Sequence, residues 1–318
     1  MSNTSAAGTR LGYLGPAGTF AEQALRSLDI ARGAELVPHA SVPTAIAAVR
    51  DGSVAAALIP IESSVEGSVP STLDALASGE PLHIIDEVAL SIRFVLAARP
   101  GVSLAEITLV AAHPHAEAQT REWIAEHLNG VSVIPALSNA DAAKSLADGQ
   151  GAHDAAVTNT LAASYYGLNV LADDIGDEEE ATTRFVLVAR PSTLPEPTGA
   201  DRTSLMLFMR ADHPGALLEI LTEFAVRGVN LTRIESRPTR RALGDYFFSI
   251  DCEGHVDDAR VAETLKGLHR ICARVVFLGS YPRHDGREAH IRPGTTDADF
   301  DAAATWFAAI KGIAGTQS

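Results

Sequence analysis

A segment rich in proline and small polar residues, 191–199, divides the chain into two parts with different rhythms of secondary structure. In residues 10–190, short apolar runs alternate with segments of helical periodicity. This alternation predicts an α/β domain with a mostly parallel sheet that is covered by helices on both faces. Ligands of such folds bind beyond the carboxyl ends of the strands, so the residues that follow each strand are the first candidates for a site.

The first part contains many short elements, and two of its helices have recognisable starts. Thr19 and Glu22 have the spacing of a capping box, and Ser41 precedes a proline at the start of a second helix. Further helices are expected near 68–70, at 116–128 and at 140–147. The expected strands are 11–14, 55–60, 82–85, 91–97, 107–112, 131–134, 155–158, 170–172 and 184–189.

After the linker, the order of elements changes to strand, helix, strand, strand, helix, strand within about 80 residues. This order predicts a ferredoxin-like βαββαβ domain. The expected strands are 203–209, 229–236, 246–251 and 273–279, and the expected helices are 216–227 and 257–268. Beyond Pro282 we expect a partly mobile tail that contains one amphipathic helix at 300–310.

The charge balance limits the kinds of partner that the chain can bind. The 318 residues include 25 Lys and Arg against 40 Asp and Glu, which gives a net charge of −15. Nucleic-acid binding requires basic patches, so a nucleic-acid partner is disfavoured. The overall field also repels anions, so an anion site must be local and built from backbone N–H groups and one or two arginines.

The distribution of apolar residues and cysteines predicts a cytoplasmic protein. No segment approaches the ~20 consecutive apolar residues that a membrane-spanning helix needs, so no membrane partner is expected. The first eight residues are small and polar and lack the apolar core of a secretory signal. Two cysteines, Cys252 and Cys272, cannot build a disulfide framework, which fits a reducing compartment.

The segment 180–188 places three useful groups at the mouth of a strand. Thr183 offers a hydroxyl, Arg184 a fixed positive charge and Phe185 a flat apolar ring. This combination suits a small, anionic, ring-shaped ligand.

Two turns that follow strands and open helices, 15–20 and 60–69, add further hydroxyls and free backbone N–H groups. A helix N-terminus favours an anion by about 0.3–1 kcal/mol. Each turn alone is explained by plain N-capping, but together with Thr183 and Arg184 they indicate a carboxylate site. The first turn lacks the spacing of a nucleotide-binding loop, and no cofactor motif is found elsewhere.

Other polar motifs give weaker signals. His113 and His115 flank a proline after a strand, which is weak evidence for a metal, and Gln119 lies one turn into the helix expected there. In the second part, Gly215 lies in a tight turn that opens a helix. Glu235 and Arg237 end the neighbouring strand, where they offer a carboxylate for an ammonium group and a cation for a carboxylate. Ordinary turn chemistry explains these last residues equally well.

Taken together, these motifs make the chain similar to the prephenate dehydratases, which convert prephenate to phenylpyruvate in phenylalanine biosynthesis. The resemblance covers about residues 10–282 and is carried by 15–20, 60–69, His113-Pro114 with Gln119, and Thr183-Arg184-Phe185. The family usually has asparagine where this chain has Ser63, often glutamine at His115, and often serine at Ala112. A serine hydroxyl is shorter than an amide and has one donor instead of two.

The resemblance implies a fold and a division of the chain. It implies a two-lobed, type II periplasmic-binding-protein-like catalytic domain at 10–190, with the active site in the cleft. The first lobe would comprise about 10–85 and 178–190, and the second about 86–177. A linker at 191–201, a regulatory ACT domain at 202–282 and a tail at 283–318 would follow.

The resemblance also implies roles for individual residues. Thr183 would be the catalytic residue. The implied substrate-binding residues are Thr19, Glu62, Ser63, Ser64, Gln119, Arg184 and Phe185. The implied site for L-phenylalanine as effector consists of Gly215, Ala216, Leu217 and Leu218 together with Glu235, Ser236, Arg237 and Pro238. No cofactor and no metal are implied.

The implied enzyme is a monofunctional, decarboxylating hydro-lyase that forms a homo-oligomer, either a dimer or a tetramer. Two alternatives stay open. An arogenate dehydratase would act on a substrate that has an amine where prephenate has a keto group. A non-catalytic amino-acid sensor would bind without turnover, although no output domain such as a helix-turn-helix is evident.

Overall fold

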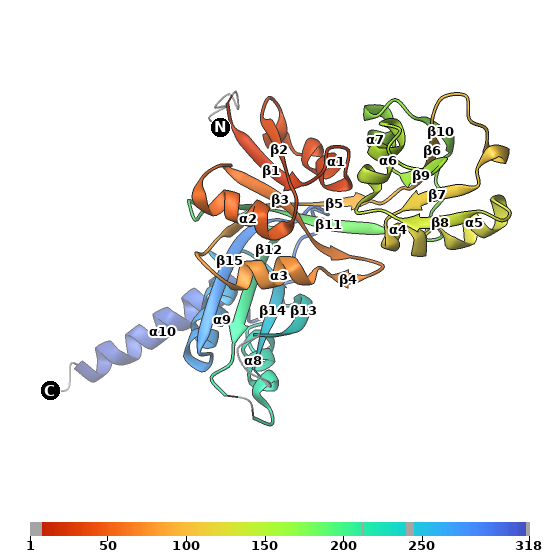
Figure 1. Ribbon diagram of the computed structural model, residues 1–318. Coiled ribbons are helices and arrows are strands. Elements are labelled where there is room, and N and C mark those ends of the chain that lie inside the picture. The colour runs from red at the N-terminus through yellow and green to blue at the C-terminus, as the bar shows by residue number, and fades with distance from the viewer. Residues whose placement is uncertain (1–7, 212, 240–244, 316–318) are drawn as a thin grey trace. The chain divides into compact units, whose positions relative to one another are not determined.

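The computed structural model describes residues 8–211, 213–239 and 245–315, and the chain divides into two compact units (Figure 1). The first unit comprises Met1–Ala75 and Val88–Arg190, and the second comprises Leu76–Glu87 and Pro191–Ser318. None of the helices in the described ranges has the length and apolar character that a bilayer crossing requires.

The first lobe of the first unit is built on a mixed sheet with the order β2-β1-β3-β11-β5, and the part of its edge strand β5 up to Glu87 is grouped with the second unit. The strand β1 runs parallel to β2 and β3, whereas β11 runs antiparallel to β3, and the short β4 folds back on the end of β3. The strands are β1 (Arg10–Leu14), β2 (Glu35–His39), β3 (Ala56–Ser63), β4 (Gly67–Ser68), β5 (His83–Ser91) and β11 (Thr182–Ala189). The helices are α1 (Phe20–Ser27), α2 (Val42–Asp51), α3 (Pro70–Ala77) and the 3-10 turn η1 (Asp29–Ala31).

The second lobe has its own mixed sheet, with the order β10-β6-β9-β7-β8, and one hydrophobic cluster on each face. The strands are β6 (Val95–Ala98), β7 (Leu109–Ala112), β8 (Ser132–Pro135), β9 (Ala155–Thr158) and β10 (Asn169–Ala172). The helices are α4 (Pro114–Ala118), α5 (Arg121–His127), α6 (Asn139–Ala147), α7 (Thr160–Tyr165) and the 3-10 turn η2 (Leu104–Glu106).

The two lobes confirm a two-lobed α/β architecture, but the prediction of one mostly parallel sheet is wrong. The chain leaves the first sheet after β5 and returns to it as β11, so the returning strand lies antiparallel to β3. The expected bounds of the strands 82–85 and 91–97 also differ from those in the structure. A continuous β5 reaches Ser91, and β6 starts only at Val95. The first crossing between lobes therefore lies at 91–95, later than expected.

The single helix expected at 116–128 is two helices, α4 and α5, which are separated at Gln119 and Thr120. The cause is a distant carboxylate. Asp177 accepts hydrogen bonds from the N–H groups of Glu122 and Trp123, at 3.1 Å each, and so provides α5 with its own N-terminal cap. Gln119 is consequently the C-cap residue of α4 and does not lie within a helix.

The predicted helix starts are confirmed at α2 and partly at α1. At α2, Ser41 and Thr44 form a full capping box. At α1, the Thr19 hydroxyl accepts from the Glu22 N–H at 3.4 Å and donates to the Leu14 carbonyl at 2.8 Å. The Glu22 carboxylate does not return to Thr19, because it accepts from the Gly18 N–H at 2.7 Å and from the hydroxyl of Tyr13.

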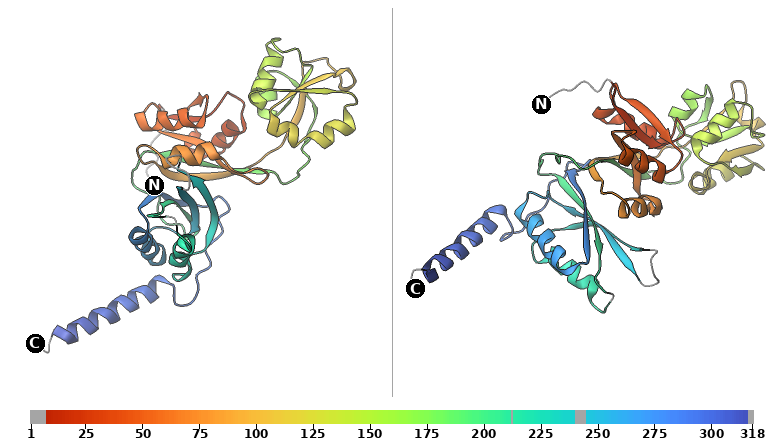
Figure 2. Two further views of the ribbon diagram at one scale, coloured as in Figure 1. Left: turned by 60° about the horizontal axis from the view of Figure 1, so that its bottom comes forward. Right: turned by 60° about the vertical axis from the view of Figure 1, so that its left-hand side comes forward.

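The second unit confirms the βαββαβ order and forms an antiparallel sheet with the order β13-β14-β12-β15. The strands are β12 (Asp201–Phe208), β13 (Leu231–Pro238), β14 (Tyr246–Glu253) and β15 (Arg274–Pro282). Helices α8 (Ala216–Ala225) and α9 (Ala259–Ile271) lie together against the sheet over a shared apolar core (Figure 2). The tail forms α10 (Asp297–Gly315), which contains the expected helix, and every side chain from 301 to 312 is exposed.

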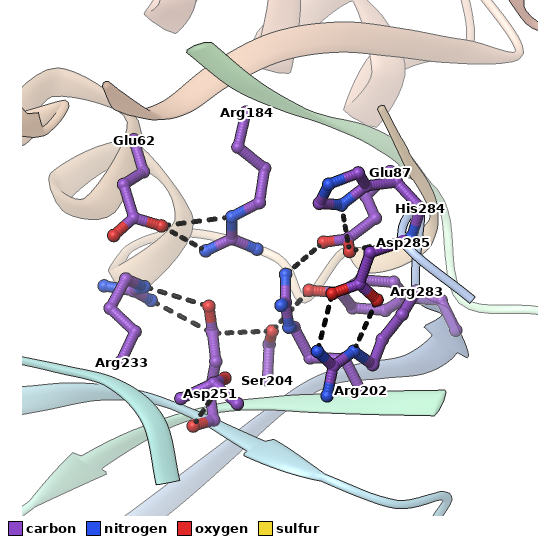
Figure 3. Close-up of polar contacts among 12 residues, drawn as sticks. Glu62, Glu87, Arg184, Arg202, Ser204, Arg233, Asp251, Arg283, His284 and Asp285 are labelled. Carbon is purple, nitrogen blue, oxygen red and sulfur yellow. Dashed lines mark hydrogen bonds and ion pairs between the residues drawn. The ribbon is translucent and has the colours of Figure 1, made fainter. Parts of the chain in front are cut away.

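A buried polar network lies within the second unit (Figure 3). Glu87 of β5 is fully buried, and its carboxylate pairs with Arg202 Nη1 at 2.5 Å and with His284 Nδ1 at 3.1 Å. On the sheet β13-β14-β12-β15, Asp251 accepts from the Ser204 hydroxyl at 2.7 Å and from Arg233 Nε at 2.9 Å. These charged groups are buried only because each has partners, since an unpaired buried charge is costly.

Candidate active site

A cleft of about 490 Å³ lies between the two lobes of the first unit. This volume is within the usual range for small-molecule sites. The first lobe and the crossing segments contribute Phe20, Ser63, Glu66, Gly67, Ser68, Val69, Pro70, Ile92, Phe94, Ala181, Thr183 and Phe185, and the second lobe contributes His115, Ala116, Gln119 and Asn139. Among the described residues, no lysine or arginine lines this cleft.

Strand β11 places Thr183 and Phe185 in the cleft and Arg184 outside it. Side chains alternate between the two faces of a strand, so consecutive residues cannot share a face. The Arg184 side chain is buried, and its Nε and Nη2 atoms lie 3.1 Å from Oε2 of Glu62 (Figure 3). Glu62 lies directly across the sheet on β3. The structure thus joins these two predicted site residues to each other and leaves both outside the cleft lining.

The hydroxyl groups of Thr183 and Ser63 face the cleft from paired positions of β11 and β3. Within the described ranges, the Thr183 hydroxyl has no hydrogen-bond partner. Ser63 Oγ accepts from the N–H groups of Val65 and Glu66 at 3.3 and 3.4 Å. These bonds use its lone pairs and leave its O–H proton available. Two hydroxyl donors therefore lie side by side: Thr183, which has no partner among the described residues, and Ser63, whose oxygen is held by two backbone N–H groups.

Ser64 and Thr19, which were also predicted, do not line the main cleft. Ser64 is exposed, and its hydroxyl accepts from the Thr182 N–H at 2.9 Å, which ties the β3–β4 hairpin to β11. Thr19 caps α1 and lines an adjoining pocket of about 300 Å³. That pocket shares Phe20, Asn139 and Phe185 with the cleft.

Gln119, one of the predicted substrate-binding residues, lines the cleft, and it belongs to a cluster that the sequence interpretation missed. Its Nε2 atom donates to Oε1 of Glu66 at 3.3 Å, and Nδ1 of His115 pairs with Oε2 of the same carboxylate. Glu66 lies within the segment 60–69, from which only Glu62, Ser63 and Ser64 were predicted to bind substrate. Asn139 was missed as well. Its position at the start of α6, just beyond strand β8, could have identified it as a site residue from the sequence.

His113 is held neutral beside this cluster. Burial lowers the pKa of His113, the nearby His115 ring lowers it further, and Glu66 opposes the shift. The ring accepts a hydrogen bond from the His115 N–H at 3.3 Å, which requires an unprotonated nitrogen. His113 therefore contributes no positive charge to the cleft.

Glu22 anchors the loop before α1 to the second lobe. Burial alone would raise the pKa of Glu22, but hydrogen bonds from the Gly18 N–H, Arg26 and Tyr165 outweigh it and lower the pKa. Nearby, Asn159 Nδ2 donates to the Gly18 carbonyl at 3.0 Å. These bonds from Tyr165 of α7 and from its N-cap residue Asn159 tie the two lobes together.

The predicted effector residues lie at two places in the second unit. Gly215 has φ 93° and is the N-cap of α8, a backbone conformation that favours glycine. Of the next three residues, Ala216 is buried, whereas Leu217 and Leu218 are 37% and 67% exposed. Glu235, Ser236, Arg237 and Pro238 end β13. A pocket of about 250 Å³ at the start of α8 includes Ala216 in its lining, together with His213, Glu219 and Arg270.

Comparisons with known proteins agree on one family. Residues 11–193 match the family model described as prephenate dehydratase, and residues 203–270 match the ACT domain. A Mycobacterium marinum protein named prephenate dehydratase is 50% identical over 281 residues, which cover 86% of this chain and 88% of the relative.

Solved structures indicate the same family, and one of them is described with a different activity. A structure described as prephenate dehydratase from Arthrobacter aurescens in complex with L-Phe aligns with a TM-score of 0.92 at 50% identity, over 96% of this chain and 100% of that chain. A structure described as GqqA, a quorum-quenching acylase, aligns with a TM-score of 0.77 at 32% identity, over 86% of this chain and 97% of that chain.

Proposed function

Because this chain belongs to the prephenate dehydratase family, we propose that it converts prephenate to phenylpyruvate in the biosynthesis of L-phenylalanine. It is a carbon–oxygen lyase that combines decarboxylation with dehydration. The observation that carries the proposal is the cleft of the first unit, where the free hydroxyl of Thr183 lies beside Ser63 and an aromatic wall.

The chemistry of the substrate defines what the cleft must do. Prephenate has a ring carboxylate, a pyruvyl carboxylate and a ring hydroxyl. The bond between the ring and its carboxylate breaks and its electron pair enters the ring, while the C–O bond breaks and its pair leaves with hydroxide. The hydroxide takes a proton and becomes water, and carbon dioxide is released. Because the product ring is aromatic, the reaction needs no external electron acceptor.

The step that benefits from assistance is the departure of the oxygen, and Thr183 is the proposed donor. An aliphatic hydroxyl is a poor acid, so Thr183 stabilises the developing charge by a hydrogen bond and does not transfer its proton completely. One preorganised donor of this kind is worth about 2.7–4 kcal/mol of barrier. The aromatic wall beside it consists of Phe185 and the edge-to-face pair Phe20 and Phe94, whose ring centroids are 5.6 Å apart.

The carboxylates of the substrate are bound by neutral donors. The cleft offers the hydroxyls of Ser63 and Ser68 and the amides of Gln119 and Asn139. Thr19, Ser64 and the Glu62–Arg184 pair support the walls of the cleft and do not touch the substrate in this proposal. Arg184 acts by fixing the end of β3 against β11, which holds Ser63 opposite Thr183.

Regulation by L-phenylalanine through the second unit is part of the proposal. The match to the ACT domain and the relative in complex with L-Phe support it. The effector would bind near Gly215 and Glu235–Arg237, where two copies of the chain meet. Exposed Leu217, Leu218 and Ile234 support a homo-oligomer, a dimer or a tetramer, because a second copy would cover them. We place the enzyme in the cytoplasm, with which two unpaired, buried cysteines are compatible.

The decisive experiment is an ultraviolet assay for phenylpyruvate with purified protein and prephenate. Arogenate and an N-acyl amide substrate are assayed in parallel, because they represent the amino substrate and the acylase activity of one structural relative. We expect turnover of prephenate and inhibition by L-phenylalanine. Binding without turnover would identify a sensor and refute the proposed enzyme. An unchanged rate at millimolar L-phenylalanine would refute the regulatory part.

A further inference from the structure

The cleft contains a carboxylate–histidine pair that the dehydratase reaction does not explain. Among the described lining residues, Glu66 and His115 are the only ionisable ones, and they come from opposite lobes. Glu66 lies in the β3–β4 hairpin, and His115 lies in the first turn of α4. A carboxylate is an unexpected wall for a site that must bind a substrate with two negative charges.

Both oxygens of the Glu66 carboxylate are engaged. Oε2 pairs with His115 Nδ1, and Oε1 accepts from Gln119 Nε2 at 3.3 Å. The histidine contributes its N–H, and a full positive charge whenever the ring is protonated. Two further titratable groups lie close to His115 in the chain: the His113 ring, whose centroid lies 4.9 Å from that of His115, and Glu117 on the same helix. His115 is thus the ring that faces Glu66.

The effect of Glu66 on binding depends on whether the side chain of the substrate has a keto group, as in prephenate, or an ammonium group, as in arogenate. A bare carboxylate repels the pyruvyl carboxylate of prephenate, but it attracts the ammonium group of arogenate. A carboxylate that is engaged by the His115 ring and by the Gln119 amide repels the pyruvyl carboxylate less and attracts the ammonium group less. The side chains of Glu66 and His115 are 35% and 61% exposed, so solvent screens these effects, and a change of about tenfold is expected rather than many thousandfold.

We propose that His115, by masking Glu66, makes the cleft select the keto substrate prephenate over the amino substrate arogenate. Glu66 and His115 are thus specificity-determining residues, and neither needs to touch the departing oxygen. This inference rests on the proposed dehydratase function and extends it to the choice between two substrates. It predicts that the preference can be shifted from the pair alone, with Thr183 unchanged.

The test compares both substrates in four variants. His115→Leu removes the masking donor, and we expect the KM for prephenate to rise about tenfold while kcat/KM for arogenate holds or rises. Glu66→Gln removes the attracting charge and should lower kcat/KM for arogenate by a similar factor. In the double variant no charge is left to mask, so the KM for prephenate should return towards the wild-type value. Glu117→Gln, on the same helix but outside the cleft lining, is the matched control and should change neither substrate.

Two results would overturn the inference. The first is an equal loss for both substrates in His115→Leu. The second is the same rise in the KM for prephenate with and without Glu66→Gln, which would mean that His115 acts by its shape alone. Wild-type turnover tests the dehydratase function separately. The dissociation constants of both substrates are also measured in a Thr183→Val background, so that the selectivity is read from binding even where turnover is absent.

Discussion

Replacing Thr183 by valine is the sharpest perturbation that the structure offers. The two side chains have nearly the same shape, so the change removes one hydroxyl and little else. Thr183 is half-buried on β11 and lines the cleft, and no described residue accepts or donates a hydrogen bond at its hydroxyl. The variant therefore loses no internal hydrogen bond, and valine is favoured in a strand.

The expected magnitudes follow from these contacts. The free energy of unfolding should change by less than about 0.5 kcal/mol, because no buried polar group loses its partner. Turnover should fall by about 10²–10³, which corresponds to about 2.7–4 kcal/mol for the loss of one preorganised donor to a developing negative charge. The KM should change little, since the donor acts on the departing oxygen and binds the ground state only weakly.

The assay measures kcat and KM for prephenate together with unfolding in urea. Thr182→Val is the matched control, because the neighbouring threonine lies outside the cleft lining and its hydroxyl donates to the Glu180 carbonyl at 3.1 Å. The control should keep its activity and lose about 0.5–1.5 kcal/mol of stability at most. If Thr183→Val retains activity within a factor of three of the wild type, or if Thr182→Val is equally impaired, the assignment of the donor is wrong.

Three further predictions concern stability. Glu87→Gln should lower the free energy of unfolding by about 3–5 kcal/mol in urea titrations, because Arg202 would stay buried without its carboxylate, and a combined Arg202→Met change should recover part of the loss. The pKa of Glu22 is lowered in the folded state, so its contribution is fully present above the unfolded pKa of about 4.3 and is lost as the pH falls through the folded pKa. Below about pH 5, wild-type stability should therefore fall more steeply than that of Glu22→Gln, and parallel curves would contradict this. Deletion of 301–318 should cost less than about 1 kcal/mol, because the side chains of 301–312 are exposed, and a loss above 2 kcal/mol would show that α10 is packed in solution.

Local signals in the sequence were sufficient for most helix starts and for the second unit. The capping box of Ser41 and Thr44 needs only residues three apart, and the βαββαβ order appears directly in the apolar periodicity. The break between α4 and α5 was missed because its cause is Asp177, which reaches the start of α5 from more than fifty residues away in the chain. The antiparallel return of β11 was missed for a similar reason, since strand direction depends on the crossing between lobes.

Three consecutive residues of the candidate site show the same difference between what local sequence predicts and what the tertiary structure decides. The sequence placed Thr183, Arg184 and Phe185 together at the mouth of a strand, and the pleat of β11 separated them, with two facing the cleft and the arginine paired with Glu62 outside it. A resemblance carried by motifs cannot reveal the face on which each side chain lies.

By itself, the sequence determined the order of the elements, the family motifs and the presence of a hydroxyl, an amide and an aromatic ring where strands end. The tertiary structure decided which of these groups share one cavity, and it brought Glu66 and His115 together across two lobes. The physical reason is the distance along the chain over which each interaction acts. Caps and periodicity act over three or four residues, whereas strand register and lobe closure depend on contacts between segments that are far apart in the chain.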